Sequence, residues 1–202
     1  MTTFRPRAMF YLLAILFMAP SACKSNDDDD DSADDDLNDD DDDDTLEVID
    51  TGANGCAELG IDEPGEPLSF NTLVCNGNEM RSHTSSSGPF AELGAKAIDD
   101  QAELDALLAA DPDFAQLFAE QCTVDFTADS LLAVGTTVYS GGCATIEFCD
   151  VYQNDDGNTA IVYFYDCHGG DDVVTAPYHL VLTPKLSAPV AFTVYRREEA
   201  VQ

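Results

Sequence analysis

The sequence predicts an α+β domain in which one or two short helices pack on a mostly antiparallel sheet that disulfide bonds reinforce. Two short amphipathic patterns between residues 99 and 119 predict the helices. Five strand-sized apolar runs follow them, and Asn154-Asp155-Asp156-Gly157 separates two of these runs as a hairpin turn. Helices followed by a run of hairpin-sized strands are typical of the α+β class.

The first 22 residues have the pattern of an export signal. Arg5 and Arg7 precede a 12-residue apolar run, Ala8–Ala19. That run fits the core of a signal peptide, and it is shorter than the roughly 20 apolar residues that a membrane-spanning helix needs. We therefore expect residues 1–22 to direct export.

A cysteine stands directly after this signal. Cys23 follows the small residues Ser21 and Ala22, and the junction resembles a bacterial lipoprotein signal. The resemblance implies cleavage before Cys23, acylation of its sulfur and attachment to a membrane through the acyl chains. Pro20 departs from this pattern, which usually has an aliphatic residue at that position. Ordinary secretion after cleavage behind Ala22, or a free thiol at Cys23, are the alternatives.

A disordered, Asp-rich tether is predicted for residues 23–50. Residues 27–44 hold 14 of the chain's 40 acidic residues and no Lys or Arg. Such a segment cannot bury enough apolar surface to offset the entropy of ordering, and its charges repel one another. The formal net charge of −32 argues against nucleic acid as a partner, because phosphates are repelled. Divalent cations are expected to associate with the Asp run only weakly and diffusely.

The region before the helices is predicted to be irregular. Gly and Pro interrupt residues 51–89, which form a Cys-containing section packed on the domain. Within this section, Leu68–Cys75 alternates like a strand, and Asn76-Gly77-Asn78 marks a turn. Ala91–Ile98 then predicts a further strand.

Capping signals and apolar spacing predict the two helices. Asp100 and Glu103 have the spacing of a capping box, and Asp111-Pro112 provides a cap and a first-turn proline for the second helix. The residues expected to face the core are Leu104, Leu107, Leu108, Phe114, Leu117 and Phe118. Five strands are predicted to follow: Ser130–Thr137, Ala144–Gln153, Asn158–Cys167, Tyr178–Thr183 and Val190–Tyr195.

The cysteines predict disulfide bonds. Seven are present, and setting Cys23 aside leaves an even number in an exported chain. Export implies an oxidising compartment, so up to three bonds are expected, while sequence alone leaves their connectivity open. The hairpin turn places Cys143 roughly opposite residue 168, which predicts the pair Cys143–Cys167. For the other two bonds we predict Cys56–Cys75 and Cys122–Cys149.

Three motifs occur in order along the second half of the chain: Val124–Val134 (VDFTADSLLAV), Ser140–Phe148 (SGGCATIEF) and Thr175–Val181 (TAPYHLV), the last followed by Thr183-Pro184-Lys185. With the helix that precedes them, they resemble the PrcB C-terminal domain family over roughly residues 90–195. We place the domain at residues 90–196 and a tail at 197–202. Cys143 stands where the family usually has an aromatic residue.

The resemblance implies an α+β fold in a protein of a kind that is commonly exported or lipid-anchored. The name-giving protein of the family is associated with a surface protease complex as a non-catalytic subunit, which implies an accessory role. The motifs themselves have a structural character. Asp125 and Asp129 suit turns before a strand, Gly141-Gly142 permits a tight turn or bulge, and Pro177 suits a strand start.

Metal chemistry has one candidate cluster. Cys167-His168 lies close to Asp171 and Asp172 in the sequence. A disulfide cysteine beside a polar loop is the interpretation we prefer, because the spacing of a metal motif is absent. The chain has only three histidines, His83, His168 and His179, too few to indicate metal or catalytic chemistry.

Catalytic and calcium-binding interpretations are weaker than structural ones. Ser85, Ser86 and Ser87 follow His83 on a polar loop, but no nucleophile-elbow motif is present. Asp155-Asp156 is interpreted as a turn rather than a set of calcium ligands. We therefore expect no catalytic residue, no cofactor and no metal site.

Taken together, these patterns predict a non-catalytic bacterial lipoprotein of the cell envelope, at the outer membrane or cell surface. Its domain is expected to scaffold or stabilise an exported protein partner. A secreted or surface hydrolase or metal-dependent enzyme is one alternative, and a calcium-responsive binding module is another. Secretion without an anchor is the alternative location.

Overall fold

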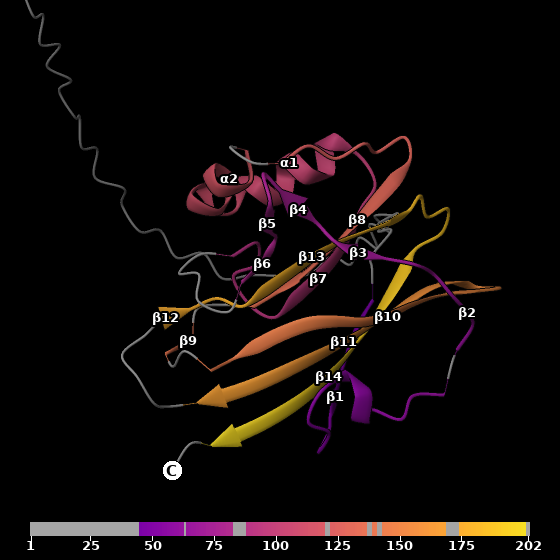
Figure 1. The fold of residues 1–202 in the computed structure, drawn as a ribbon, viewed down its shortest axis with the longest axis vertical. Coiled ribbons are helices and arrows are strands. Elements are labelled where there is room, and N and C mark those ends of the chain that lie inside the picture. The colour runs from indigo at the N-terminus through magenta and orange to yellow at the C-terminus, as the bar shows by residue number, and fades with distance from the viewer. Residues whose placement is uncertain are drawn as a thin grey trace, which may run out of the picture. The chain divides into compact units, whose positions relative to one another are not determined.

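The computed structural model describes residues 45–62, 64–82, 88–119, 122–136, 139–140, 143–168 and 174–200. Half of these residues lie in strands and 14% in helices, so the α+β prediction holds in a mostly β form. Two helices, a middle sheet and an outer sheet form three layers (Figure 1). The middle sheet is therefore covered on both faces.

The outer sheet contains strands of both directions. Its order is β1 (Leu46–Asp50), β14 (Val190–Ala200), β11 (Gly157–His168), β10 (Thr145–Asn154) and β2 (Glu66–Pro67). β10 is antiparallel to β11 and β2, whereas β14 runs parallel to both β11 and β1. β14 can run parallel to β11 because the two are not joined by a hairpin. Between them the chain crosses to the middle sheet and forms β13 there.

The middle sheet is antiparallel throughout its described part. Its order is β3 (Asn71–Thr72), β13 (Tyr178–Pro184), β8 (Asp129–Gly135) and β7 (Gly94–Ile98), and β6 (Arg81–Ser82) also pairs with β13. Two small ladders stand apart from it: β4 (Val74–Cys75) with β5 (Asn78–Glu79), and β9 (Tyr139–Ser140) with β12 (Val174–Thr175).

One hydrophobic core fills the space between the two sheets. Alternate residues of β11, namely Ala160, Val162 and Phe164, point into it because successive side chains of a strand face opposite sides. Phe192 and Val194 of β14 join them in the same register. The middle sheet contributes Leu132, Val134 and Val181 from its opposite side.

A second core, the helix-side core, lies between the middle sheet and the helices α1 (Gln101–Ala109) and α2 (Pro112–Ala119). Leu104, Leu107, Phe114 and Phe118 are buried there as predicted, and Leu108 is partly buried. Both predicted caps form: Asp100 accepts a hydrogen bond from the Glu103 N–H at 2.9 Å, and Asp111 accepts one from the Phe114 N–H at 2.9 Å.

The predicted hairpin joins β10 and β11 at a turn over Asp155 and Asp156. A bulge between Phe148 and Asp150 shifts the register by one residue, so Thr145 pairs with Tyr165. Continued by two residues, this register sets Cys143 opposite Cys167 rather than residue 168. The structure has this disulfide bond, with 5.9 Å between the Cα atoms.

The other two predicted disulfide pairs, Cys56–Cys75 and Cys122–Cys149, are wrong. The structure pairs Cys56 with Cys149 and Cys75 with Cys122. Cys56, in the short helix η1 (Cys56–Glu58), lies against β10, whereas Cys75 is buried among the residues of the helix-side core. The chain changes layer between these two cysteines, so proximity in sequence does not give proximity in space.

Two predicted boundaries also need correction. The strand predicted at Leu68–Cys75 is divided, because Asn71–Thr72 pairs with β13 whereas Val74–Cys75 pairs with β5 across a turn in which Asn76 and Gly77 have positive φ. Residues 46–50, placed within the tether, form strand β1. Their alternating Leu46 and Val48 fit a strand, and the partner that orders them, β14, lies near the other end of the chain.

Candidate functional site

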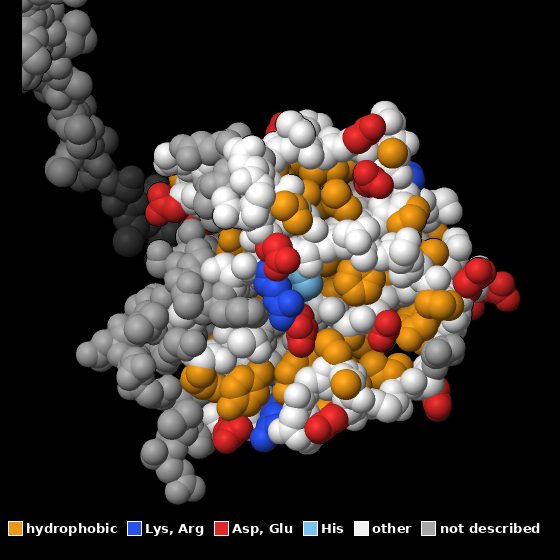
Figure 2. All heavy atoms as spheres, viewed as in Figure 1, with side chains coloured by type: hydrophobic (Ala, Val, Ile, Leu, Met, Phe, Trp, Pro, Cys, Tyr) orange, Lys and Arg blue, Asp and Glu red, His pale blue; other side chains and the backbone are white. Residues whose placement is uncertain are grey.

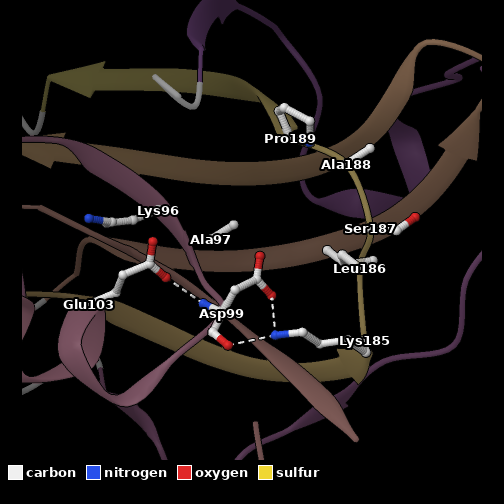
Figure 3. A pocket seen from close by; sticks show the side chains of 9 residues that line it. All are labelled: Lys96, Ala97, Asp99, Glu103, Lys185, Leu186, Ser187, Ala188 and Pro189. Atoms are coloured by element: carbon white, nitrogen blue, oxygen red, sulfur yellow. Dashed lines mark hydrogen bonds and ion pairs between the residues drawn. The ribbon is translucent and has the colours of Figure 1, made fainter. Parts of the chain in front are cut away.

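A hollow of about 430 Å³ lies where β7 leads into α1 (Figure 3). The Lys185 ammonium donates to the Asp99 backbone carbonyl at 2.6 Å and to its carboxylate at 3.0 Å. Ser130 donates to the same carboxylate and accepts the Leu186 N–H at 2.9 Å. These bonds join the start of α1 to the loop before β14, so Asp99 and Lys185, which line the hollow, have a structural role.

A second hollow, of about 370 Å³, lies on the outer face of the outer sheet. Tyr165 donates its hydroxyl proton to the Glu199 carboxylate at 2.9 Å, and this bond is the main reason that the pKa of Tyr165 is raised. Arg197 lies 5.9 Å from the centre of the Tyr165 ring and 3.3 Å from Glu199. The phenol is therefore neutral at pH 7 and acts as a hydrogen-bond donor.

Tyr163 occupies the neighbouring position of the same hollow. Its hydroxyl donates to the Ala53 carbonyl at 3.0 Å, which holds the segment before η1 against the sheet. Burial raises the pKa of Tyr163, and nearby Arg197 opposes this rise. The Cys56–Cys149 bond fastens the same segment a few residues further on. This part of the outer face is thus covered by residues 51–58.

His179 joins the two sheets in the interior. It is 3% exposed, and its Nδ1 accepts the Phe148 N–H at 3.1 Å. Because a backbone N–H can only donate, Nδ1 carries no proton, and the neutral ring donates from Nε2 to the Thr72 hydroxyl at 2.9 Å. His179 therefore has a structural role. Arg81 of β6 and Glu147 of β10 form an ion pair that also joins the middle sheet to the outer sheet.

The edge strand β1 presents a third candidate surface, besides the two hollows. Leu46 and Val48 are 38% and 42% exposed, and with Val74 they are the exposed large apolar side chains of the described residues. β1 pairs on one side with β14 and, within the described part of the chain, has no strand on its other side. Figure 1 shows β1 in indigo beside β14 in the lower layer. Sequence reasoning missed this surface, although the alternation Leu46-Glu47-Val48 signals a strand.

Several residues singled out in the sequence lie outside the described part of the structure. These are Cys23, His83, Ser85–Ser87, Asp171, Asp172 and residues 27–44. His168 is the last residue of β11, and its side chain is not described. Asp155 and Asp156 form the hairpin turn. Among the described residues, His, Cys, Asp and Glu side chains form no group of three or more that could hold a metal ion.

The helices of the described segments are all too short or too polar to span a membrane. Comparison with protein-family models, curated proteins and solved structures found no match to this chain.

Proposed function

We propose that this chain is a non-catalytic protein of the bacterial cell envelope, anchored through acyl chains on Cys23, whose domain scaffolds or stabilises an exported partner protein. The observation that carries the proposal is the edge strand β1, which has one edge without a partner strand in the described part of the chain and exposes Leu46 and Val48. Exposed apolar side chains beside unpaired backbone groups are typical of protein-binding surfaces. This surface begins where the acidic segment 27–44 ends.

Two further features support the proposal. The three disulfide bonds agree with folding in an oxidising compartment outside the cytoplasm. The three PrcB-like motifs supply strands β8, β10 and β13. An accessory role in an exported complex, as the resemblance implies, requires a surface for a partner and no reacting groups.

Photo-crosslinking in intact cells tests the partner. A photoreactive amino acid is placed singly at four exposed positions on different parts of the domain: Leu46, Val74, Asp105 and Asp155. We expect a discrete protein adduct from at least one position, strongest at Leu46. If no position gives an adduct, the proposed scaffolding function is wrong. The distribution over four positions also identifies the face that binds.

Labelling with radioactive palmitate tests the anchor. Wild type is expected to incorporate label and to sediment with membranes, whereas Cys23→Ser should do neither. Cys143→Ser/Cys167→Ser is the matched control, since it removes other sulfurs and leaves Cys23 in place. Equal labelling of wild type and Cys23→Ser would contradict lipidation at this site.

A further inference from the structure

We propose that β1 binds an extended, basic segment of the partner protein, which adds to the outer sheet as its next strand. This inference rests on the proposed function and specifies the chemistry of the partner. It is carried by three observations on β1: the direction of its backbone groups, the exposure of its apolar side chains and the charge around it.

The backbone of β1 has one edge bonded to β14 and one edge that meets no strand of the described residues. Thr45 accepts the Phe192 N–H at 2.8 Å, and Thr51 donates to the Arg196 carbonyl at 2.7 Å. Backbone groups alternate in direction along a strand, so the odd-numbered residues 45–51 bond to β14. The N–H and C=O groups of Leu46, Val48 and Asp50 therefore point away from the sheet. These residues can form a ladder with one further strand.

The side chains of β1 favour an apolar covering. Leu46 pairs with Phe192 and Val48 with Val194, so these pairs share one face of the sheet. Phe192 and Val194 are buried in the core between the sheets, yet Leu46 and Val48 on the same face are exposed. A further strand would place apolar side chains next to them and extend this core by one strand.

The negative charge around β1 favours a basic partner strand. β1 contains Glu47 and Asp50 and follows directly on the acidic residues 27–44. Asp50 is ion-paired with Arg196 at 2.9 Å, whereas no ion pair is seen for Glu47 among the described residues. Acidic side chains are also scattered over the face in Figure 2. A basic segment is attracted to this edge, and a second copy of a chain with net charge −32 is repelled.

The other edges of the two large sheets differ from β1 in the features that discourage strand addition. β2 is two residues long and contains Pro67, β3 is two residues long, and β7 carries Lys96. Short strands, proline and lysine are common protections of an edge. β1 is five residues long, has a regular register with β14 and contains none of these protections. Among the described edges of the two large sheets, β1 is thus the one that is neither short nor carries proline or lysine, and its charged side chains, Glu47 and Asp50, are acidic.

A designed peptide tests strand addition on the full chain. The probe is a fluorescent peptide about ten residues long, in which Lys alternates with Val and Thr. We expect saturable binding that weakens as salt is raised, since the attraction is partly between exposed charges. A peptide with Glu in place of Lys, and one with N-methyl groups along both backbone edges, should not bind. Binding of the acidic or the methylated peptide equal to that of the probe would overturn the proposal.

Variants of β1 locate the binding site. Leu46→Thr/Val48→Thr keeps strand propensity but removes the apolar covering, and we expect it to weaken probe affinity at least about tenfold. Val48→Pro removes one outward N–H without removing a bond to β14, and a similar loss is expected. Val74→Thr is the matched control, because it makes the same change at an exposed position elsewhere. Equal affinity of all variants, or no saturable binding to wild type, would overturn the proposal.

Hydrogen exchange gives a readout at single residues. The amides of Leu46, Val48 and Asp50 should gain protection when the probe binds, whereas those of Glu47 and Ile49 are already bonded to β14. Protection at other elements with none at β1 would contradict strand addition. A concentration-dependent dimer that Val48→Pro abolishes would assign the edge to a second copy and also overturn the proposal.

The crosslinking experiment separates this inference from the proposed function. Adducts from Val74, Asp105 or Asp155 with none from Leu46 would leave a scaffolding function in place and rule out β1 as its surface. No adduct from any of the four positions would contradict both the scaffolding function and strand addition at β1.

Discussion

The middle sheet is covered on both faces, whereas the outer sheet is fully covered on one face only. In β8 of the middle sheet, Leu131–Val134 are all completely buried, because one face meets the helices and the other meets the outer sheet. In β11 of the outer sheet, Val162 and Phe164 face the core while Tyr165 faces the second hollow. The middle sheet therefore holds the layers together, and the outer sheet presents the surface.

The same difference extends to how each sheet is held. The middle sheet is stabilised by two large apolar cores, and none of the three disulfide bonds of the described residues joins two of its strands. The covering of the outer face is a short segment, residues 51–58, held by the Cys56–Cys149 bond and the Tyr163 hydrogen bond. Changes near the middle sheet should accordingly affect global stability more than changes on the outer face.

The largest effect is expected from Phe114→Ala in the helix-side core. Phe114 is completely buried, and its ring packs edge-on against Tyr178 at 5.1 Å between centroids. Removing a buried aromatic ring loses its burial and leaves a cavity, so the free energy of unfolding should fall by about 3–5 kcal/mol. Urea denaturation followed by circular dichroism measures this change.

Val74→Ala is the control for this prediction. It removes an apolar side chain that is 57% exposed on the β4–β5 hairpin, and it should change the free energy of unfolding by less than about 0.5 kcal/mol. Similar losses for Phe114→Ala and Val74→Ala would contradict the view that the middle sheet depends on its two cores.

A smaller and more local effect is expected from Cys56→Ser/Cys149→Ser. This bond joins cysteines 93 residues apart, and its removal should lower the free energy of unfolding by about 2–4 kcal/mol. Because the bond fastens residues 51–58, their amides should exchange faster in the native state while those of β8 stay protected. Cys75→Ser/Cys122→Ser is the matched control, since it releases the β4–β5 hairpin instead. Unchanged exchange at residues 51–58 would show that the hydrogen bonds of Thr51 and Tyr163 hold this segment without the disulfide bond.

Much of the fold could be predicted because its signals are local. The caps at Asp100 and Asp111, the apolar spacing of α1 and the turn before Gly157 each depend on a few neighbouring residues. The Cys143–Cys167 pair follows from the same hairpin, with a bulge that corrects its register by one residue. These features need no knowledge of how the layers stack.

The features that prediction missed depend on distant parts of the chain. β1 forms a strand because β14 supplies its backbone partners, and no residue near Leu46 signals that pairing. The Cys56–Cys149 and Cys75–Cys122 bonds depend on which layer each cysteine occupies. The candidate site at β1 was missed for the same reason, since its exposure becomes visible only when the sheet order is known.

The smallest effect is expected at Tyr165 in the outer hollow. Its bond to Glu199, helped by burial, raises the pKa of Tyr165 above that of an ordinary phenol, while Arg197 opposes the rise. Because the folded state favours the neutral phenol, this contribution to stability is fully present below the unfolded-state pKa and is lost as pH rises through the folded-state pKa. The domain should therefore lose a small part of its stability on the alkaline side.

Glu199→Gln separates the cause of the raised pKa of Tyr165 from the cause of the raised pKa of Tyr163. The substitution removes the charged acceptor, so the pKa of Tyr165 should fall toward its ordinary value. The pKa of Tyr163, raised mainly by burial, should change little. Carbon-13 NMR of the tyrosine rings as a function of pH resolves the two phenols. If Tyr165 titrates unchanged in Glu199→Gln, its hydrogen bond to Glu199 does not hold in solution, and the outer face is held by fewer contacts than the middle sheet.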